Sequence, residues 1–162
     1  MMTLCCDVLK ALKGKTLATA ESCTGGGIGA AITAVPGASK VYVGGVVSYT
    51  NDVKRDVLGV PQTLLDEYGA VSSPVAKAMA EGVRRITGAD LAVSVTGVAG
   101  PDRDDRGNEV GTVYLAVSSA QGTVVELRHY GGGRSRQRIR NEAAFTAFCL
   151  LLQHLEENQP TN

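Results

Sequence analysis

Apolar residues follow two patterns along this chain, one with helical spacing and one with short continuous runs rich in β-branched residues. Helical spacing predicts an opening helix over 4–12, a helix over 24–34, short helices ending near 58 and 68, a long helix over 72–87 and a last helix over 135–156. The continuous runs predict strands over 16–20, 41–48, 91–95, 110–119 and 123–129. Alternating strands and helices with a hairpin around 120–122 predict an α/β fold, a single-domain α/β/α sandwich with a mixed five-stranded sheet.

Some local details of these elements can be predicted as well. The run over 41–48 is continuous and apolar, which predicts a central strand buried on both faces. Gly44 and Gly45 within it predict a bulge or a close approach of the backbone. Helix caps are expected at Thr24, at Asn51 or Asp52, and at Ser135. One face of the long helix is expected to pack inward through Val75, Ala78, Met79, Gly82, Val83 and Ile86.

Length and composition indicate one domain over 1–162, with a loose tail over 158–162. The chain has 162 residues, of which 44% are hydrophobic and 20% are charged. Its 16 basic and 16 acidic residues cancel, so no field is expected that would hold a nucleic acid. No apolar run approaches the ~20 residues that cross a bilayer, and the first residues lack a signal-type core. We therefore expect no membrane partner and no export.

Cysteine and histidine content bears on redox compartment and metal binding. The cysteines are Cys5, Cys6, Cys23 and Cys149. They form no C-x-x-C pair, which predicts reduced thiols in a cytoplasmic protein. His129 and His154 have no second ligand at helical spacing, and Arg106 stands where the calcium-loop-like stretch 102–107 needs an oxygen ligand. We expect no metal, no cofactor and a solvated loop at 102–107.

Polar residues gather where three of the predicted strands end, at 21–24, 48–50 and 96–97. Open α/β sheets bind ligands beyond the carboxyl ends of their strands, so these three segments are expected to converge. Small residues over 22–29 open a helix whose backbone N–H groups can face an anion or an oxyanion. The glycines match neither the P-loop nor the dinucleotide-binding pattern, and tight helix packing explains them equally well.

A serine at the first of these strand ends, Ser22, is a candidate nucleophile. A serine hydroxyl needs a base, and lysine is the available substitute for histidine here. Lys54 follows the second strand end in the first turn of a helix, where the macrodipole lowers the pKa of an ammonium group. A solvated lysine is the more frequent situation at such a position. Tyr49 can hydrogen-bond the nucleophile or the lysine and relay a proton, or it can be a packing ring.

Cys23 competes with Ser22 for the role of nucleophile, because a helix N-terminus lowers a thiol pKa. Packing of one buried thiol is the ordinary alternative. Among the arginines that open the last helix, Arg136 lies on the same stripe as the apolar residues, which suits a phosphate at a helix N-terminus. Arg134 and Arg138 are expected to be solvated.

Five ordered motifs together resemble the C-terminal domain of the CinA family over about 17–152. They are Ala20-Glu21-Ser22-Cys23-Thr24-Gly25-Gly26, Pro36-Gly37-Ala38-Ser39, Gly44-Gly45-Val46-Val47-Ser48-Tyr49-Thr50-Asn51, Gly69-Ala70-Val71-Ser72 and Val95-Thr96-Gly97-Val98-Ala99-Gly100-Pro101. The resemblance implies a nicotinamide-nucleotide amidohydrolase, which converts nicotinamide mononucleotide and water to nicotinate mononucleotide and ammonia.

The resemblance also implies roles for individual residues. The family's nucleophile falls on Ser22, its basic lysine on Lys54 and its assisting tyrosine on Tyr49. Its substrate-site threonine and arginine fall on Thr96 and Arg136. The expected substrate site is completed by Gly97 and by the turn after the nucleophile, which is formed by Cys23, Thr24 and Gly25.

The sequence departs from the family's pattern in two places. Many relatives have Gly-Asp-Arg before the last helix, whereas this chain has Arg134-Ser135-Arg136, which leaves open whether Arg136 or Arg140 holds the phosphate. The stretch 102–106 is rich in arginine and aspartate where relatives often carry glycine, and it could alter the mouth of the pocket.

Two other functions remain open at this point. One is a non-catalytic module of the same fold, either nucleotide-binding or competence-associated. The other is an amidase that depends on Cys23. Some family members carry an additional N-terminal pyrophosphatase domain, and that activity is expected to be absent here. Family resemblance and several amphipathic helices beside one modest sheet also predict a homodimer.

Overall fold

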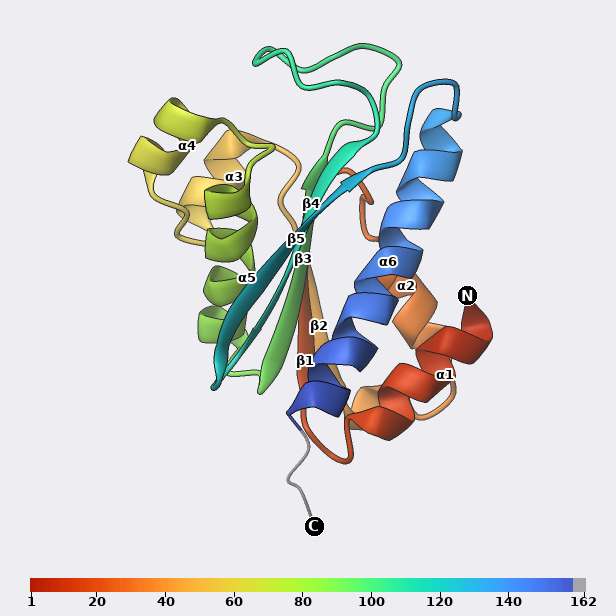
Figure 1. Ribbon diagram of the computed structural model, residues 1–162. Helices are drawn as coiled ribbons and strands as arrows, with labels where there is room; N and C mark the ends of the chain where they lie inside the picture. Colours follow the sequence, from red (N-terminus) through yellow and green to blue (C-terminus); the bar gives the residue numbers. More distant parts are fainter. Residues whose placement is uncertain (159–162) are drawn as a thin grey trace.

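The computed structural model describes residues 1–158 and forms one five-stranded sheet flanked by helices (Figure 1). The strands are β1 (Leu17–Glu21), β2 (Tyr42–Val47), β3 (Leu91–Gly97), β4 (Thr112–Ser119) and β5 (Gly122–His129). The helices are α1 (Met2–Ala11), α2 (Gly27–Thr33), the 3-10 helix η1 (Ala38–Lys40), α3 (Asn51–Asp56), α4 (Gln62–Tyr68), α5 (Ser73–Thr87) and α6 (Arg136–Glu157). The predicted tail falls on residues 159–162, outside the described residues, apart from Asn158.

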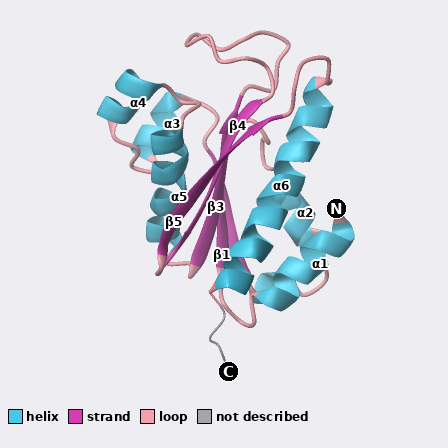
Figure 2. Ribbon diagram, viewed as in Figure 1, coloured by secondary structure: helices cyan, strands magenta, loops and turns pink. Residues whose placement is uncertain are grey.

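The sheet has the strand order β2-β1-β3-β4-β5, with β2, β1 and β3 parallel and β4 and β5 antiparallel. Helices α3, α4 and α5 lie on one face, and α1, α2 and α6 lie on the other (Figure 2). The predicted α/β/α sandwich with a mixed five-stranded sheet is confirmed. Among residues 1–158, every helix is too short or too polar to cross a lipid bilayer.

The two faces of the sheet carry side chains of different size. Leu17, Leu91 and Val93 point toward α1, α2 and α6 and form the larger core. Alternate residues such as Ala18 and Ala92 point toward α5. Because alanine projects little from a strand, α5 packs closely on this face.

The prediction of a central strand over 41–48 is wrong, because β2 pairs only with β1 and forms an edge of the sheet. Its residues alternate in burial, and Val43 and Val47 are each 49% exposed. A continuous apolar run means burial on both faces only where helices cover both, which is not so at this edge. The glycine prediction is confirmed: the register shifts beside Gly44, whose φ is +141°, and a Cβ on Gly45 would collide with Thr19.

Several element boundaries also differ from the predictions. Helix α2 begins at Gly27, so Thr24 is not its cap, and Thr50 caps α3 through the Val53 N–H. Ile86 is exposed, whereas the inward face of α5 includes Ala76 and Ala80 instead. The predicted cap of the last helix is confirmed, because the Ser135 hydroxyl accepts the Arg138 N–H at 3.2 Å.

Candidate active site

A pocket of about 180 Å³ lies beyond the carboxyl ends of the parallel strands. In Figure 1 this is the upper end of the sheet, where β3 runs into the loop that leads to β4. The pocket is lined by Ser22, Cys23, Tyr49, Lys54, Ala70, Val71, Thr96, Gly97, Ala99 and Arg136. The three predicted strand ends therefore converge, and seven of the nine predicted site residues share this pocket. Thr24 and Gly25 do not line it.

The Ser22 hydroxyl and the Lys54 amine are in contact at the base of the pocket. Lys54 Nζ lies 3.0 Å from Ser22 Oγ and donates to the Ser48 carbonyl at 2.6 Å. The amine is fixed from both sides, since Ser22 follows β1 and Ser48 follows β2. Lys54 is 1% exposed, so a solvated lysine is the wrong interpretation of this position.

Burial changes the protonation of Lys54. It lowers the pKa of the amine from 10.5 to about 8, because the charged form loses its hydration. The predicted direction is therefore right, but burial rather than the helix macrodipole is the main cause. At neutral pH a pKa of about 8 leaves roughly one amine in ten uncharged, which is enough to supply a base. The uncharged amine can accept the Ser22 proton while one N–H still bonds the Ser48 carbonyl.

The turn after Ser22 is held by Glu21, a residue to which sequence analysis assigned no role. The buried Glu21 carboxylate accepts the Thr24 hydroxyl at 2.6 Å and the N–H groups of Gly26, Ile28 and Gly29. These bonds satisfy the start of α2, which is why Thr24 does not cap it. The predicted free anion site at the first turn of this helix is thus already occupied by a carboxylate of the chain itself.

Two backbone N–H groups beside Ser22 are candidate donors to a ligand. Gly25 N–H donates to the Ser22 carbonyl and Gly27 N–H to the Thr24 carbonyl. Within residues 1–158, neither the Cys23 N–H nor the Thr24 N–H donates to a backbone carbonyl. They follow Ser22 directly, so they are the candidate donors to the oxyanion that forms on a carbonyl oxygen when the Ser22 hydroxyl attacks the carbonyl carbon.

The structure assigns different tasks to the two arginines considered for phosphate binding. Arg140 donates to the carbonyls of Cys23 and Thr24, at 3.1 and 3.2 Å, and so holds the turn that follows Ser22. Arg136 instead reaches the pocket, as its position on the inward stripe predicts. Its guanidinium donates to the Gly100 carbonyl and, at 2.6 Å, to the Tyr49 hydroxyl.

Tyr49 lies at the mouth of this pocket rather than beside Ser22 and Lys54. It is 56% exposed, and its hydroxyl bonds Arg136, not Ser22 or Lys54 as predicted. A tyrosine two residues beyond the edge strand points outward because the strand has no neighbour to cover it. In this arrangement Tyr49 can orient Arg136.

Two of the remaining predicted residues shape the pocket wall. Thr96 is buried, and its hydroxyl donates to the Ala70 carbonyl at 2.8 Å. At Gly97 an added Cβ would meet Val113 and the Thr112 carbonyl, at 2.6 and 2.8 Å. Thr96 therefore holds the Ala70 backbone in the pocket wall, and Gly97 allows β4 to approach closely.

The pKa of the Cys23 thiol is raised, whereas the sequence predicted that it is lowered. Cys23 is 5% exposed, and burial raises the pKa of its thiol to about 11. The expected lowering by a helix start is absent because α2 begins four residues later and Glu21 faces its first turn. A thiol in this state is a poor nucleophile near neutral pH.

We therefore expect Cys23→Ala to leave turnover nearly unchanged. The substitution removes a small buried side chain, so kcat should stay within about threefold of that of the unmodified chain while stability falls by about 1 kcal/mol. Steady-state kinetics and denaturant unfolding measure the two effects. Loss of turnover without loss of folding would restore the thiol as nucleophile.

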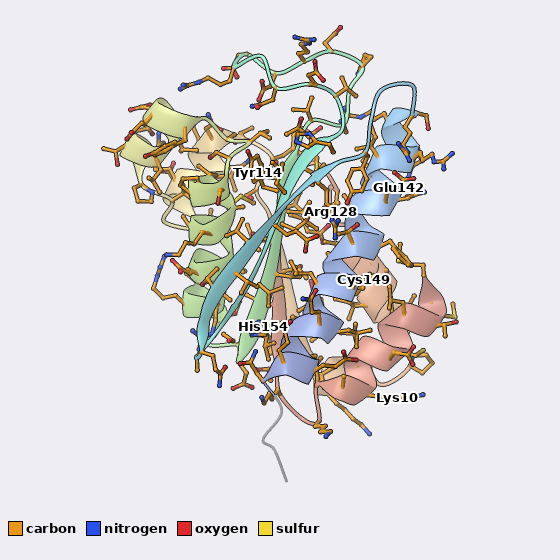
Figure 3. All side chains as sticks on the ribbon, viewed as in Figure 1. Lys10, Tyr114, Arg128, Glu142, Cys149 and His154 are labelled. Atoms are coloured by element: carbon orange, nitrogen blue, oxygen red, sulfur yellow. The ribbon has the colours of Figure 1, made fainter. Side chains whose placement is uncertain are left out.

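Other candidates lie away from this pocket. Arg134 and Arg138 are exposed, as predicted, and each also pairs with Glu142 on α6 at 3.0 Å. His154 bonds the Ser119 hydroxyl at 2.9 Å near the opposite end of the sheet (Figure 3). Within residues 1–158, His, Cys, Asp and Glu form no group of three or more that could hold a metal ion. Asp104 folds the 102–107 loop by accepting the N–H groups of Arg106 and Asn108.

The fold and the pocket define an α/β protein with a buried serine–lysine pair beyond the carboxyl ends of its parallel strands. Residues 2–155 match the CinA C-terminal domain, and the chain belongs to that family, as its motifs predicted. A CinA-like protein from Synechococcus sp. (strain CC9311) is 54% identical over 135 residues, which are 82% of this chain and 32% of that protein. Another from Geobacter metallireducens is 49% identical over 142 residues, 88% of this chain and 34% of that protein.

Solved structures agree with this assignment. The competence damage-inducible protein A (ComA) from Klebsiella pneumoniae has a TM-score of 0.93 and 33% identity, with 98% of both chains covered. The competence/damage inducible protein CihA from Agrobacterium tumefaciens has a TM-score of 0.90 and 39% identity, with 96% of this chain and 94% of that chain covered. This chain spans about a third of the length of the curated relatives it matches.

Proposed function

We propose that this chain hydrolyses the carboxamide of nicotinamide mononucleotide, giving nicotinate mononucleotide and ammonia. The observation that carries the proposal is the 3.0 Å contact between Ser22 Oγ and a buried Lys54 whose pKa is lowered to about 8. Such a pair supplies a nucleophile and a base near neutral pH, which amide hydrolysis needs. The family resemblance supplies the identity of the amide.

The first half of the reaction forms an ester on Ser22. Uncharged Lys54 takes the hydroxyl proton as Ser22 Oγ attacks the carboxamide carbon. The N–H groups of Cys23 and Thr24 stabilise the negative charge that develops on the carboxamide oxygen. The carbon–nitrogen bond then breaks, and the proton on Lys54 passes to the departing nitrogen, which leaves as ammonia.

The second half returns the enzyme to its starting state. A water molecule gives a proton to Lys54 and attacks the ester carbon. The bond to Ser22 Oγ breaks, Lys54 returns its proton to that oxygen, and nicotinate mononucleotide departs. Water supplies the added oxygen, so the reaction balances without any further reactant.

Pocket size and charge fit a small ring with a phosphate outside it. A volume of about 180 Å³ is smaller than the ~300 Å³ lower bound for pockets that enclose whole drug-sized ligands, so it suits one ring. Ala70, Val71 and Ala99 give this ring apolar neighbours. Arg136, in the first turn of the 22-residue helix α6, places a guanidinium and the helix N-terminus at the mouth for the phosphate.

Arg136→Ala is accordingly expected to raise KM for nicotinamide mononucleotide about 10–100-fold with kcat within about threefold, because a charged hydrogen bond of this kind contributes about 1.5–3 kcal/mol in ground and transition states alike. Steady-state kinetics give both constants. Arg138→Ala is the matched control, since Arg138 lies on the same helix and pairs with Glu142 outside the pocket. An equal rise in KM in both variants would argue against a specific phosphate contact.

The proposed function is tested by ammonia release from nicotinamide mononucleotide, free nicotinamide and glutamine. We expect turnover of the nucleotide and little of the other two, because only the nucleotide offers both the ring and the phosphate. Tight binding of the nucleotide with no ammonia would instead support a non-catalytic nucleotide-binding module. Preference for glutamine would contradict the assignment of the substrate.

A further inference from the structure

The loop between β3 and β4, residues 98–111, is attached to the end of α4 by the side chain of Arg106. The Arg106 guanidinium donates to the carbonyls of Leu65 and Glu67, at 3.3 Å each, and to that of Asp66. In Figure 1 this loop lies above the sheet, at the same end of the molecule as α4.

The end of α4 presents carbonyl groups that favour a cationic hydrogen-bond donor. The last carbonyls of a helix lack intrahelical partners and carry the negative end of the macrodipole. The last turn of α4 contains no basic residue of its own, so Arg106 supplies donors to the Asp66 and Glu67 carbonyls from another element. The Leu65 carbonyl also accepts the Gly69 N–H at 3.0 Å. Gly69, which follows α4 with a φ of +76°, makes room for it: a Cβ there would lie 2.8 Å from Arg106 Cγ.

The end of α4 leads directly into one wall of the pocket. Ala70 and Val71 line the pocket, and the Ala70 carbonyl is held on the other side by the Thr96 hydroxyl. Asn108, on the same loop as Arg106, donates to the Val71 carbonyl at 3.5 Å. Ala99, also on this loop, lines the pocket. The loop therefore forms part of the ligand space and at the same time holds the Ala70–Val71 wall.

We propose that Arg106 is a positioning residue that fixes the spacing between the Ala70–Val71 wall and Ala99, and so sets the size of the ring that the pocket accepts. It touches neither the reacting atoms nor the ring, and it acts through the carbonyls at the end of α4. The identity of the ring rests on the proposed function, whereas the restraint on the wall does not.

The first measurement follows the wall directly. Amide hydrogen exchange over 65–71 is compared among the unmodified chain, Arg106→Ala and Arg103→Ala. Arg103 is the matched control, because it lies on the same loop and pairs with Glu109 while its side chain is 64% exposed. We expect exchange over 65–71 to accelerate about tenfold or more in Arg106→Ala alone, since local opening loses its restraint. Equal exchange in the two variants would overturn the proposal.

The second measurement follows ring selection. Calorimetry gives the dissociation constants of nicotinamide mononucleotide and of an analogue with a methyl group on the ring. A well-fitted pocket discriminates one methylene by about 10–200-fold, which here is the ratio of the two dissociation constants. We expect Arg106→Ala to reduce this ratio severalfold. Arg103→Ala and Arg106→Lys should retain most of it. An unchanged ratio in Arg106→Ala would show that the wall does not select the ring.

The outcomes separate this proposal from the proposed function. Absence of ammonia release by the unmodified chain would remove the enzyme assignment, while hydrogen exchange and the ratio of dissociation constants would still decide the role of Arg106. If the nucleotide does not bind at all, ring selection falls with the assignment of the substrate. The restraint on residues 65–71 is then decided by hydrogen exchange alone.

Discussion

Ser22→Ala is expected to lower kcat for ammonia release by about 10⁴–10⁶-fold, because removing the nucleophile leaves only binding and oxyanion stabilisation. The fold should be unaffected, since the Ser22 N–H still bonds the Val95 carbonyl at 2.9 Å. Steady-state kinetics measure the loss. Ser73→Ala is a matched control, since Ser73 is an exposed serine at the start of α5.

Binding separates a lost nucleophile from a lost pocket. The hydroxyl acts mainly in the transition state, so the dissociation constant of nicotinamide mononucleotide should change by less than about threefold in Ser22→Ala. Calorimetry measures it directly. Near-normal kcat in this variant would contradict the assigned nucleophile, and additional loss of turnover in Cys23→Ala would transfer that role to the thiol.

Lys54→Arg is expected to lower kcat by about 10³-fold or more, although it conserves the charge. A guanidinium stays protonated near neutral pH and cannot take the Ser22 proton. Lys54→Met should lose turnover equally and be as stable as the unmodified chain or more so, because it removes a buried amine whose charged form is poorly hydrated. Kinetics and denaturant unfolding of both variants measure these effects. Retained turnover in Lys54→Arg would mean that Lys54 is not the base.

The dependence of turnover on pH has a definite sign. A base works only when unprotonated, so kcat/KM of the unmodified chain should rise with pH about tenfold per unit below a pKa of about 8 and level off above it. A profile that falls over this range, or stays flat, would contradict Lys54 as the base.

The sequence predicted most of the fold and the pocket, because hydrophobic periodicity and the end points of parallel strands are local signals. It placed Ser22, Lys54 and Thr96 near one another through the rule that ligands bind beyond the carboxyl ends of strands. It did not predict that Lys54 is buried. Helix α3 has only six residues, and no periodicity in so short a segment shows which side faces the sheet.

Longer-range effects were missed for similar reasons. Ser48 fixes the lysine through its backbone carbonyl, which leaves no side-chain signal. Glu21 is an acidic residue just before a glycine-rich helix start, a pattern that favours capping. The small residues that follow it were instead interpreted as a turn whose N–H groups are free to bind an anion. The predicted lowering of the Cys23 pKa failed because burial outweighed the helix end. Arg140 contacts residues more than a hundred positions away, and no spacing rule reaches that far.

The central claim is that Lys54 activates Ser22. It is tested most directly by phenylmethanesulfonyl fluoride, whose sulfur exchanges fluoride for a nucleophilic oxygen and whose ring resembles the proposed substrate's in size. Mass spectrometry locates the label, and its rate of formation is followed against pH. We expect one label, on Ser22, forming faster up to a pH of about 8 and at least about 100-fold more slowly in Lys54→Arg. A label on Cys23, or an equal rate in Lys54→Arg, would contradict the account.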